Sequence, residues 1–144
     1  MIVAQILKSK IDMGVVSVKP SDSVSSAVAL LSEKRIGTVV VSRDGTTLDG
    51  ILSERDIVRE LGKRGVDCLS APVSEMMTAK LTTCTTGDSA DKVLEMMTEG
   101  RFRHLPVMDN GQMIGLISIG DVVKARLLEL SMEKDALEGM IMGH

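Results

Sequence analysis

Two copies of one short pattern carry the residues of this chain that could do chemistry. Residues 50–56 read Gly-Ile-Leu-Ser-Glu-Arg-Asp, and residues 115–121 read Gly-Leu-Ile-Ser-Ile-Gly-Asp. In each copy a serine stands where a helix N-cap belongs, and an aspartate follows three residues later. The pattern predicts a short apolar strand that runs directly into a helix, with Ser53 and Asp56 in the first copy and Ser118 and Asp121 in the second.

This pattern has two interpretations. A serine followed by an acid three residues later can form a capping box, which satisfies two backbone donors and has no further role. Alternatively, the free N–H groups of the helix N-terminus could bind a phosphate, and the carboxylate could accept hydrogen bonds from both hydroxyls of a ribose. The second copy favours a nucleoside phosphate, because a lone capping box gives no reason for the pattern to return.

The pattern belongs to a longer repeat. Asp22 corresponds to Asp88 and Glu33 to Glu99, and Gly45 corresponds to Gly111. Each repeat predicts the order strand, helix, strand, strand, helix. The expected strands are 15–18, 38–42 and 50–53 in the first repeat, and 81–84, 104–108 and 115–118 in the second. The dipeptides Asp44-Gly45 and Asn110-Gly111 predict the hairpin turns.

The expected fold class is therefore α/β of the α+β kind, with two repeats that cover each other around a pseudo-twofold axis. We place the first repeat in residues 1–70, including a short helix at 3–8, and the second repeat in residues 71–130. Residues 131–144 are a helical extension. In the last helix, apolar residues recur at three- and four-residue spacing, interrupted by Lys134. This helix is either a solvated helix with a core stripe or one that packs against another chain, and we favour the second interpretation.

Composition excludes several classes of function. The net charge is −3, and the chain has one Phe, no Trp and no Tyr. Without a basic stripe or aromatic platforms, nucleic-acid binding is not expected. Cys68 and Cys84 form no CxxC pair, so we expect no zinc site and no metal requirement. The sequence also shows no membrane-spanning run and no signal peptide, and we expect a cytoplasmic protein that is not an enzyme.

The doubled turn, the five-element order and the segment His104-Leu105-Pro106-Val107 resemble the tandem CBS (cystathionine-β-synthase) domain pair. The resemblance implies two clefts that bind adenine nucleotides such as AMP, ADP, ATP or NAD(H). It also implies a stand-alone regulatory module, an energy or redox sensor for a partner protein, which forms a homodimer. The alternative is a ligand-free structural or dimerisation module.

The resemblance also assigns roles to individual residues. It implies that Asp56 and Asp121 hold ribose hydroxyls and that serines or threonines at the strand and helix ends face the ribose or phosphate. The segments before the middle strands would line the adenine slot. The residues implied are Ser17, Ile36, Gly37, Thr38, Ser53, Arg55 and Asp56 in the first repeat, and Thr83, Phe102, Arg103, His104, Leu105, Pro106, Ser118 and Asp121 in the second.

The two repeats differ in the basic residues that they offer to a phosphate. Arg103 and His104 are either phosphate contacts or an exposed arginine and a satisfied histidine. The first repeat has Gly37-Thr38 in place of the His-Leu-Pro segment, and only Arg55 could compensate for the missing charge. We therefore expect the second repeat to hold the better nucleotide site.

Overall fold

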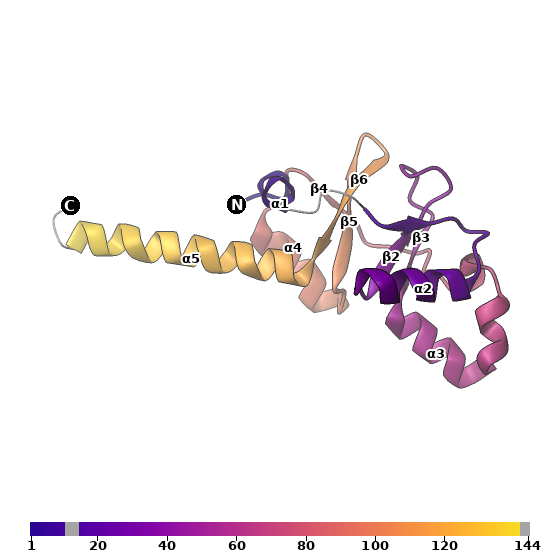
Figure 1. The fold of residues 1–144 in the computed structure, drawn as a ribbon. Helices are drawn as coiled ribbons and strands as arrows, with labels where there is room; N and C mark the ends of the chain where they lie inside the picture. Colours follow the sequence, from indigo (N-terminus) through magenta and orange to yellow (C-terminus); the bar gives the residue numbers. More distant parts are fainter. Residues whose placement is uncertain (11–14, 142–144) are drawn as a thin grey trace. The chain divides into compact units, whose positions relative to one another are not determined.

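The computed structural model describes residues 1–10 and 15–141, and within them the fold is mixed α+β (Figure 1). Each repeat has the predicted order strand, helix, strand, strand, helix. A short helix, α1 (Val3–Ser9), precedes the first repeat, and two 3₁₀ turns, Val66–Ser70 and Val73–Glu75, follow it. The elements are β1 (Ser17–Val18), α2 (Val24–Lys34), β2 (Thr38–Val41), β3 (Gly50–Ser53) and α3 (Glu54–Arg64), then β4 (Cys84–Thr85), α4 (Ala90–Gly100), β5 (His104–Asp109), β6 (Gln112–Ser118) and α5 (Ile119–Ile141).

Each repeat forms one three-stranded sheet, with orders β1-β2-β3 and β4-β5-β6. The first two strands of each sheet are parallel, with Val18 opposite Val41 and Cys84 opposite Val107. Parallel neighbours need a crossover connection, and α2 and α4 provide it. Strands β2 and β3 are antiparallel, and Thr38 lies opposite Ser53. This register brings the start of the middle strand beside the start of α3.

The crossover helices begin and end at similar signals in both repeats. Ser23 accepts a hydrogen bond from the Ser26 N–H at the start of α2, and Ser89 accepts one from the Lys92 N–H at the start of α4, both at 3.1 Å. Each helix ends at an arginine in the left-handed conformation. The predicted apolar stripes face the cores, and the fully buried members are Val24, Ala27 and Leu31 in α2, and Ala90, Val93 and Met97 in α4.

Packing groups the chain into two units, and it places the short N-terminal segment differently from the sequence prediction. The α5 unit contains α1, β4, α4, most of β5 and β6, and α5, whereas the α3 unit contains β1 to α3, both 3₁₀ turns and the tip of the β5–β6 hairpin. Val3 and Ile6 of α1 are buried in the core that contains Val107 and Ile117, so α1 completes the core of the second repeat. The domain boundaries along the chain stay a prediction, and residues 142–144 of the extension lie outside the described residues.

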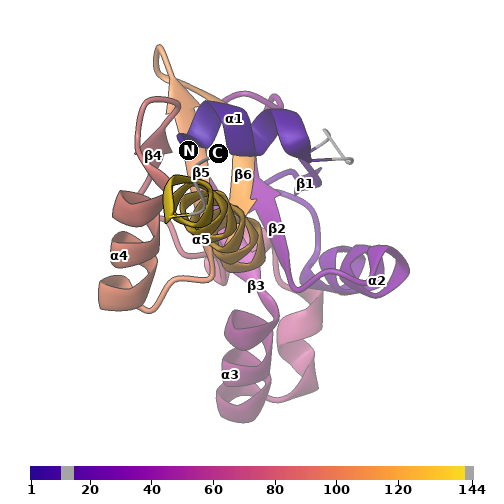
Figure 2. The same cartoon turned by 90° about the vertical axis from the view of Figure 1, so that its left-hand side faces the viewer.

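The segment between the two repeats packs against the first repeat, although it precedes the second repeat in sequence. Val73 and Met76 are buried in the α3 unit, in the core that contains Val24 and Leu52. Residues 73–75 of this segment form one 3₁₀ turn, Val73–Glu75. Each repeat therefore buries apolar side chains from the segment that precedes the other repeat in sequence. Figure 2 shows α5 with α1 and α4 beside it in the α5 unit.

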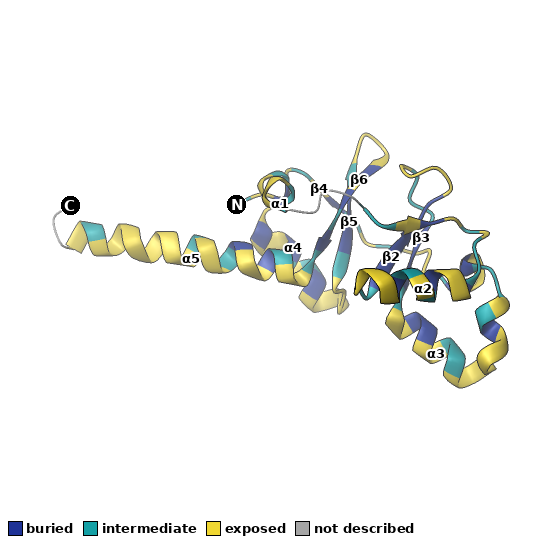
Figure 3. Cartoon of the chain, viewed as in Figure 1, coloured by how far each residue is buried: buried dark blue, intermediate teal, exposed yellow. Residues whose placement is uncertain are grey.

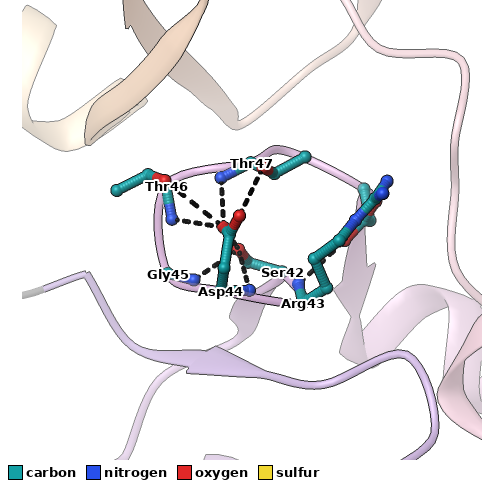
Figure 4. Close-up of polar contacts among 7 residues, drawn as sticks. Ser42, Arg43, Asp44, Gly45, Thr46 and Thr47 are labelled. Atoms are coloured by element: carbon teal, nitrogen blue, oxygen red, sulfur yellow. Dashed lines mark hydrogen bonds and ion pairs between the residues drawn. The ribbon is translucent and has the colours of Figure 1, made fainter.

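The two hairpin turns differ. Asn110 and Gly111 form the predicted tight turn, with φ of 50° and 77°, between β5 and β6. The tight turn predicted at Asp44-Gly45 is wrong, because residues 42–49 form a longer loop between β2 and β3. The Asp44 carboxylate accepts hydrogen bonds from the Thr47 N–H at 2.7 Å and the Thr46 N–H at 2.9 Å (Figure 4). These bonds hold the pKa of Asp44 well below its usual range, and they stabilise the wider loop.

Gly50 begins β3 and Gly115 lies within β6, and a side chain at either position would meet a close neighbour. A β-carbon at Gly50 would lie 2.9 Å from the Thr78 carbonyl oxygen, which accepts a hydrogen bond from the Ile51 N–H at 3.0 Å. A β-carbon at Gly115 would lie 2.9 Å from a δ-carbon of Leu7, a side-chain end that can rotate away.

We expect Gly50→Ala to lower the free energy of unfolding by about 1–3 kcal/mol, because a fixed backbone atom must move. Gly115→Ala should cost clearly less, because only a leucine rotamer must change. Urea unfolding of the two variants measures both losses. Equal losses would show that the Thr78 backbone yields as easily as the Leu7 side chain.

Candidate functional site

Two turns, which we call the signature turns, contain Ser53 with Asp56 and Ser118 with Asp121. Both fold as reciprocal capping pairs. The Ser53 hydroxyl accepts a hydrogen bond from the Asp56 N–H at 3.3 Å, and the Asp56 carboxylate accepts one from the Ser53 N–H at 3.0 Å. In the second turn the corresponding distances are 3.1 Å and 2.9 Å, between Ser118 and Asp121. Both copies therefore form the capping box, and a binding role must use the atoms that capping leaves without a partner.

A second contact joins each helix start to the segment before the middle strand. The Glu54 N–H donates to the Gly37 carbonyl at 2.9 Å, and the Ile119 N–H donates to the Arg103 carbonyl at 2.8 Å. These bonds place Gly37 next to the first signature turn and Arg103 next to the second. The predicted site segments that contain Gly37 and Arg103 therefore lie at the starts of α3 and α5.

The Asp56 carboxylate is buried, with an exposed side-chain fraction of 8%, and both of its oxygens have partners. Oδ2 accepts hydrogen bonds from the backbone N–H and the hydroxyl of Ser53. Oδ1 accepts from the Arg59 guanidinium at 3.0 Å and lies 3.5 Å from the Thr78 hydroxyl. Sequence reasoning missed Arg59 and Thr78. A ribose at Asp56 would have to displace one of these partners.

The Asp121 carboxylate has fewer hydrogen-bond partners among the described residues than the Asp56 carboxylate. Its Oδ2 accepts the Ser118 N–H and lies 3.0 Å from the Lys10 ammonium nitrogen, whereas Oδ1 has no hydrogen-bond partner among the described residues. The exposed fraction of this side chain is 24%. Burial by itself raises the pKa of Asp121, but the hydrogen bonds from Ser118 and Lys10 outweigh burial and lower the pKa. Asp121 therefore presents an ionised and accessible acceptor at neutral pH.

Lys10 pairs with Asp121 at 3.0 Å, and the charges of Asp121, Lys10 and Arg103 all act on His104. We call Lys10, Arg103, His104 and Asp121 the Asp121 cluster. Lys10 also donates to the Leu116 carbonyl at 2.8 Å, which fixes its position. Burial lowers the pKa of His104, the charges of Lys10 and Arg103 lower it further, and Asp121 opposes them. His104 is therefore neutral at pH 7, and the cluster carries a positive charge from Lys10 and Arg103. No spacing in the sequence indicated Lys10, because it lies far from Asp121 along the chain.

The first-repeat turn has a different charge balance. Arg59 pairs with Asp56 and lies 3.7 Å from a carboxylate oxygen of Glu60, and Glu54 begins the same helix. Arg55 is exposed and has no ion pair among the described residues. The basic residues here are matched by acids, so this turn attracts an anion less than the Asp121 cluster does.

A pocket of about 510 Å³ lies in the α3 unit, between α2 and the start of α3. Ile36 and Gly37 line this pocket as predicted site residues, but Asp56 does not. At about 100° per residue, Asp56 lies on a different face of α3 from Glu54 and Val58. The lining residues are Val28, Leu31, Ser32, Arg35, Ile36, Gly37, Glu54, Ile57 and Val58.

The other predicted site residues vary in accessibility. Ser17 is exposed at the start of β1, Thr83 is half-buried before β4, and Phe102 is partly exposed. Thr38 is buried, and Leu105 and Pro106 are buried within β5. A ligand could meet Leu105 and Pro106 through backbone atoms more readily than through their side chains.

Groups that would indicate metal chemistry or thiol chemistry are not found in the described parts of the chain. Within residues 1–10 and 15–141, no three His, Cys, Asp or Glu side chains gather to hold a metal ion. Burial raises the pKa of the Cys84 thiol to about 11, so little thiolate forms at neutral pH. Across these same residues, no helix combines the length and the apolar character needed to span a membrane.

A family model described as the CBS domain matches the chain twice, over residues 4–63 and 73–128. The chain belongs to the CBS domain family. The CBS domain-containing protein CBSX3, mitochondrial, of Arabidopsis thaliana is 36% identical over 126 residues, which are 85% of this chain and 61% of that protein. The chain thus spans about three fifths of the length of that relative.

Solved structures show the same fold. The CBS-domain containing protein ATU1752 from Agrobacterium tumefaciens is 43% identical, with a TM-score of 0.81, over 87% of this chain and 92% of that one. A structure of CBSX2 in complex with AMP is 30% identical, with a TM-score of 0.72, over 88% of this chain and 96% of that one. The predicted fold, a CBS-domain pair, is confirmed.

Proposed function

We propose that this CBS-domain pair binds an adenosine-containing ligand at the Asp121 cluster and that binding regulates a partner protein. The observation that carries the proposal is Oδ1 of Asp121, which has no hydrogen-bond partner among the described residues, on a carboxylate that Lys10 contacts. The Arg103 carbonyl is hydrogen-bonded to the start of α5, the helix that carries Asp121, so Arg103 adds a second cation at this end of the helix. An ionised acceptor with cations in its neighbourhood suits a molecule that has hydroxyl donors and an anionic group.

The two chemical halves of a nucleotide fit different members of the cluster. The ribose hydroxyls donate to Oδ1 of Asp121, which keeps its capping bond through Oδ2. The phosphate meets the Lys10 ammonium and the Arg103 guanidinium, which form charge-assisted hydrogen bonds. His104 is neutral before binding, and an added phosphate would favour its charged form.

The first-repeat turn is the weaker candidate in this proposal. Both Asp56 oxygens already accept hydrogen bonds, and the neighbouring charges are balanced. Binding a ribose there would cost the Arg59 or Thr78 contact, so the gain in free energy would be smaller. This ranking agrees with the sequence-based expectation that the second repeat holds the better site, because the first has Gly37-Thr38 in place of a His-Leu-Pro segment.

AMP is the first ligand to test, because the related CBSX2 has been solved in complex with AMP. ADP, ATP and NAD(H) share the adenosine and differ in the anionic part, and we propose them as alternatives. The proposed role is regulatory, as is typical of stand-alone CBS-pair proteins, and it requires that the ligand bind two arrangements of the protein with different affinities. No metal takes part in this scheme.

Thermal melting and calorimetry with AMP, ADP, ATP, NAD and adenosine test the proposal. A ligand at 100-fold over its Kd should stabilise the fold by roughly 2.7 kcal/mol. Lys10→Ala should weaken AMP binding about tenfold, by the loss of one charge-assisted bond, and change adenosine binding little. Lys8→Ala is the matched control, because Lys8 is an exposed lysine of the same segment.

Two outcomes would contradict the proposal. If no compound of the panel shifts the melting temperature, the alternative of a ligand-free structural or dimerisation module is favoured. If Lys10→Ala weakens AMP and adenosine equally, Lys10 supports the fold of the site and does not contact a phosphate.

A further inference from the structure

Apolar side chains are exposed mainly on one helix. Of the fourteen large hydrophobic side chains that are exposed among the described residues, nine lie on α5. Figure 3 shows α5 continuing beyond α1 and α4 of its own unit, with exposed residues along its outer part. From Leu130 to Ile141, every residue except Gly139 is exposed. This part of the helix has an apolar surface that its own unit does not cover.

Five of these nine apolar residues lie with Lys134 on one seam, which we define as Val123, Leu127, Leu130, Lys134, Leu137 and Ile141. Their spacing alternates between four and three residues, the pattern of positions a and d of a coiled coil. The seam is separate from the face that anchors α5, where Val122 and Ala125 are buried. At 1.5 Å per residue it runs for about 27 Å. A seam that continues past the anchored face is a surface for a second helix.

Arg126 and Glu129 mark the end of the anchored part. Arg126 pairs with Asp91 of α4, with its Nε 2.6 Å from the carboxylate, and Glu129 lies 3.1 Å from the amino group of Met1. Beyond Glu129, the one ion pair among the described residues joins Lys134 and Glu138 of the helix itself, at 3.9 Å. The outer part of the seam is therefore free to take a partner without breaking a contact to its unit.

We propose that two copies of this chain associate through this seam as an antiparallel pair of α5 helices centred on Met132. In this register Val123 faces Ile141 of the second copy, Leu127 faces Leu137, and Leu130 faces Lys134. Every seam residue is then covered, and the long aliphatic stem of Lys134 packs on a leucine while its ammonium reaches solvent.

Charge selects the antiparallel orientation. In a parallel pair, Lys134 would face Lys134 of the second copy in the seam, and Glu133 would flank Glu138, so like charges would meet at both places. In the antiparallel pair, Lys124 flanks Glu138 of the second copy, and this favourable contact forms twice. The Glu133 side chains then approach each other once, at the centre, within reach of Lys134. The antiparallel dimer therefore has more favourable charge contacts than the parallel dimer.

Leu130→Asp tests the seam, with Leu128→Asp as its control. The exposed fractions of the two leucines are 49% and 51%, but Leu128 lies off the seam. Sedimentation equilibrium should show a dimer for the parent chain, association weakened at least about tenfold in Leu130→Asp, and little change in Leu128→Asp. A monomeric parent chain, or equal effects of the two variants, would overturn the proposal.

Spin-label distances test the orientation. Met132→Cys and Gly139→Cys place labels on the same outward face of α5, and a side chain at Gly139 meets no atom within 4 Å. Both native cysteines are buried, so the labels attach at the new sites. In the antiparallel pair, the two labels at 139 are offset by about 21 Å along the axis and those at 132 by none. Equal separations for both label pairs would indicate a parallel pair and overturn the proposal.

Discussion

Replacing Asp121 by alanine should lower the affinity for AMP by about 100-fold, because two charged hydrogen bonds of about 1.5 kcal/mol each are lost. The proposed accepting atom is Oδ1, which has no partner in the described part of the chain, whereas Oδ2 accepts the Ser118 N–H and lies by Lys10. Adenosine carries the same ribose, so its affinity should fall by a similar factor. Calorimetric titration of each compound against the variant measures both losses.

Asp56→Ala is the matched control for this experiment. It removes the equivalent carboxylate from the first repeat, where both oxygens already have protein partners. We expect AMP affinity to change little in this variant. Asp121→Asn should lie between the parent and Asp121→Ala, because an amide oxygen still accepts one bond without charge. Equal losses in the two alanine variants would remove the assignment of the ligand to the second repeat.

The second large expected effect is a loss of folding stability when Asp56 is replaced. Asp56→Ala should lower the free energy of unfolding by about 2–3 kcal/mol, through the loss of a helix cap and the loss of buried bonds to Ser53, Arg59 and Thr78. The Arg59 contact is half-exposed and contributes little of this total. The Thr78 hydroxyl lies 3.5 Å from the carboxylate, a long contact, so most of the loss comes from the two Ser53 bonds and the cap.

Urea unfolding of Asp56→Ala and Asp121→Ala makes the comparison. Asp121→Ala should cost less, since its carboxylate is more exposed and only the cap and the Lys10 pair are lost. The two aspartates would then differ in role: Asp56 would mainly stabilise its turn, and Asp121 would mainly bind the proposed ligand. If Asp121→Ala destabilised the chain as much as Asp56→Ala, the difference in burial between the two turns would not control their function.

The local features of the fold could be predicted from the sequence because each depends on neighbours in the chain. The serine-aspartate turns form capping pairs over three residues, and Asn110-Gly111 forms a tight turn because both residues adopt positive φ. The same kind of reasoning was wrong for Asp44-Gly45. There the Asp44 carboxylate bonds to Thr46 and Thr47 and closes a longer loop.

The tertiary structure decided what surrounds each aspartate. Lys10 reaches Asp121 because α1 is buried in the core of the second repeat, and Thr78 reaches Asp56 because Val73 and Met76 are buried in the core of the first. Neither contact is visible in the spacing of residues, since each joins segments that are distant in sequence and is set by which apolar faces cover each other. The sequence by itself determined two similar helix starts. Long-range packing gave both oxygens of Asp56 protein partners and left one oxygen of Asp121 without a partner among the described residues.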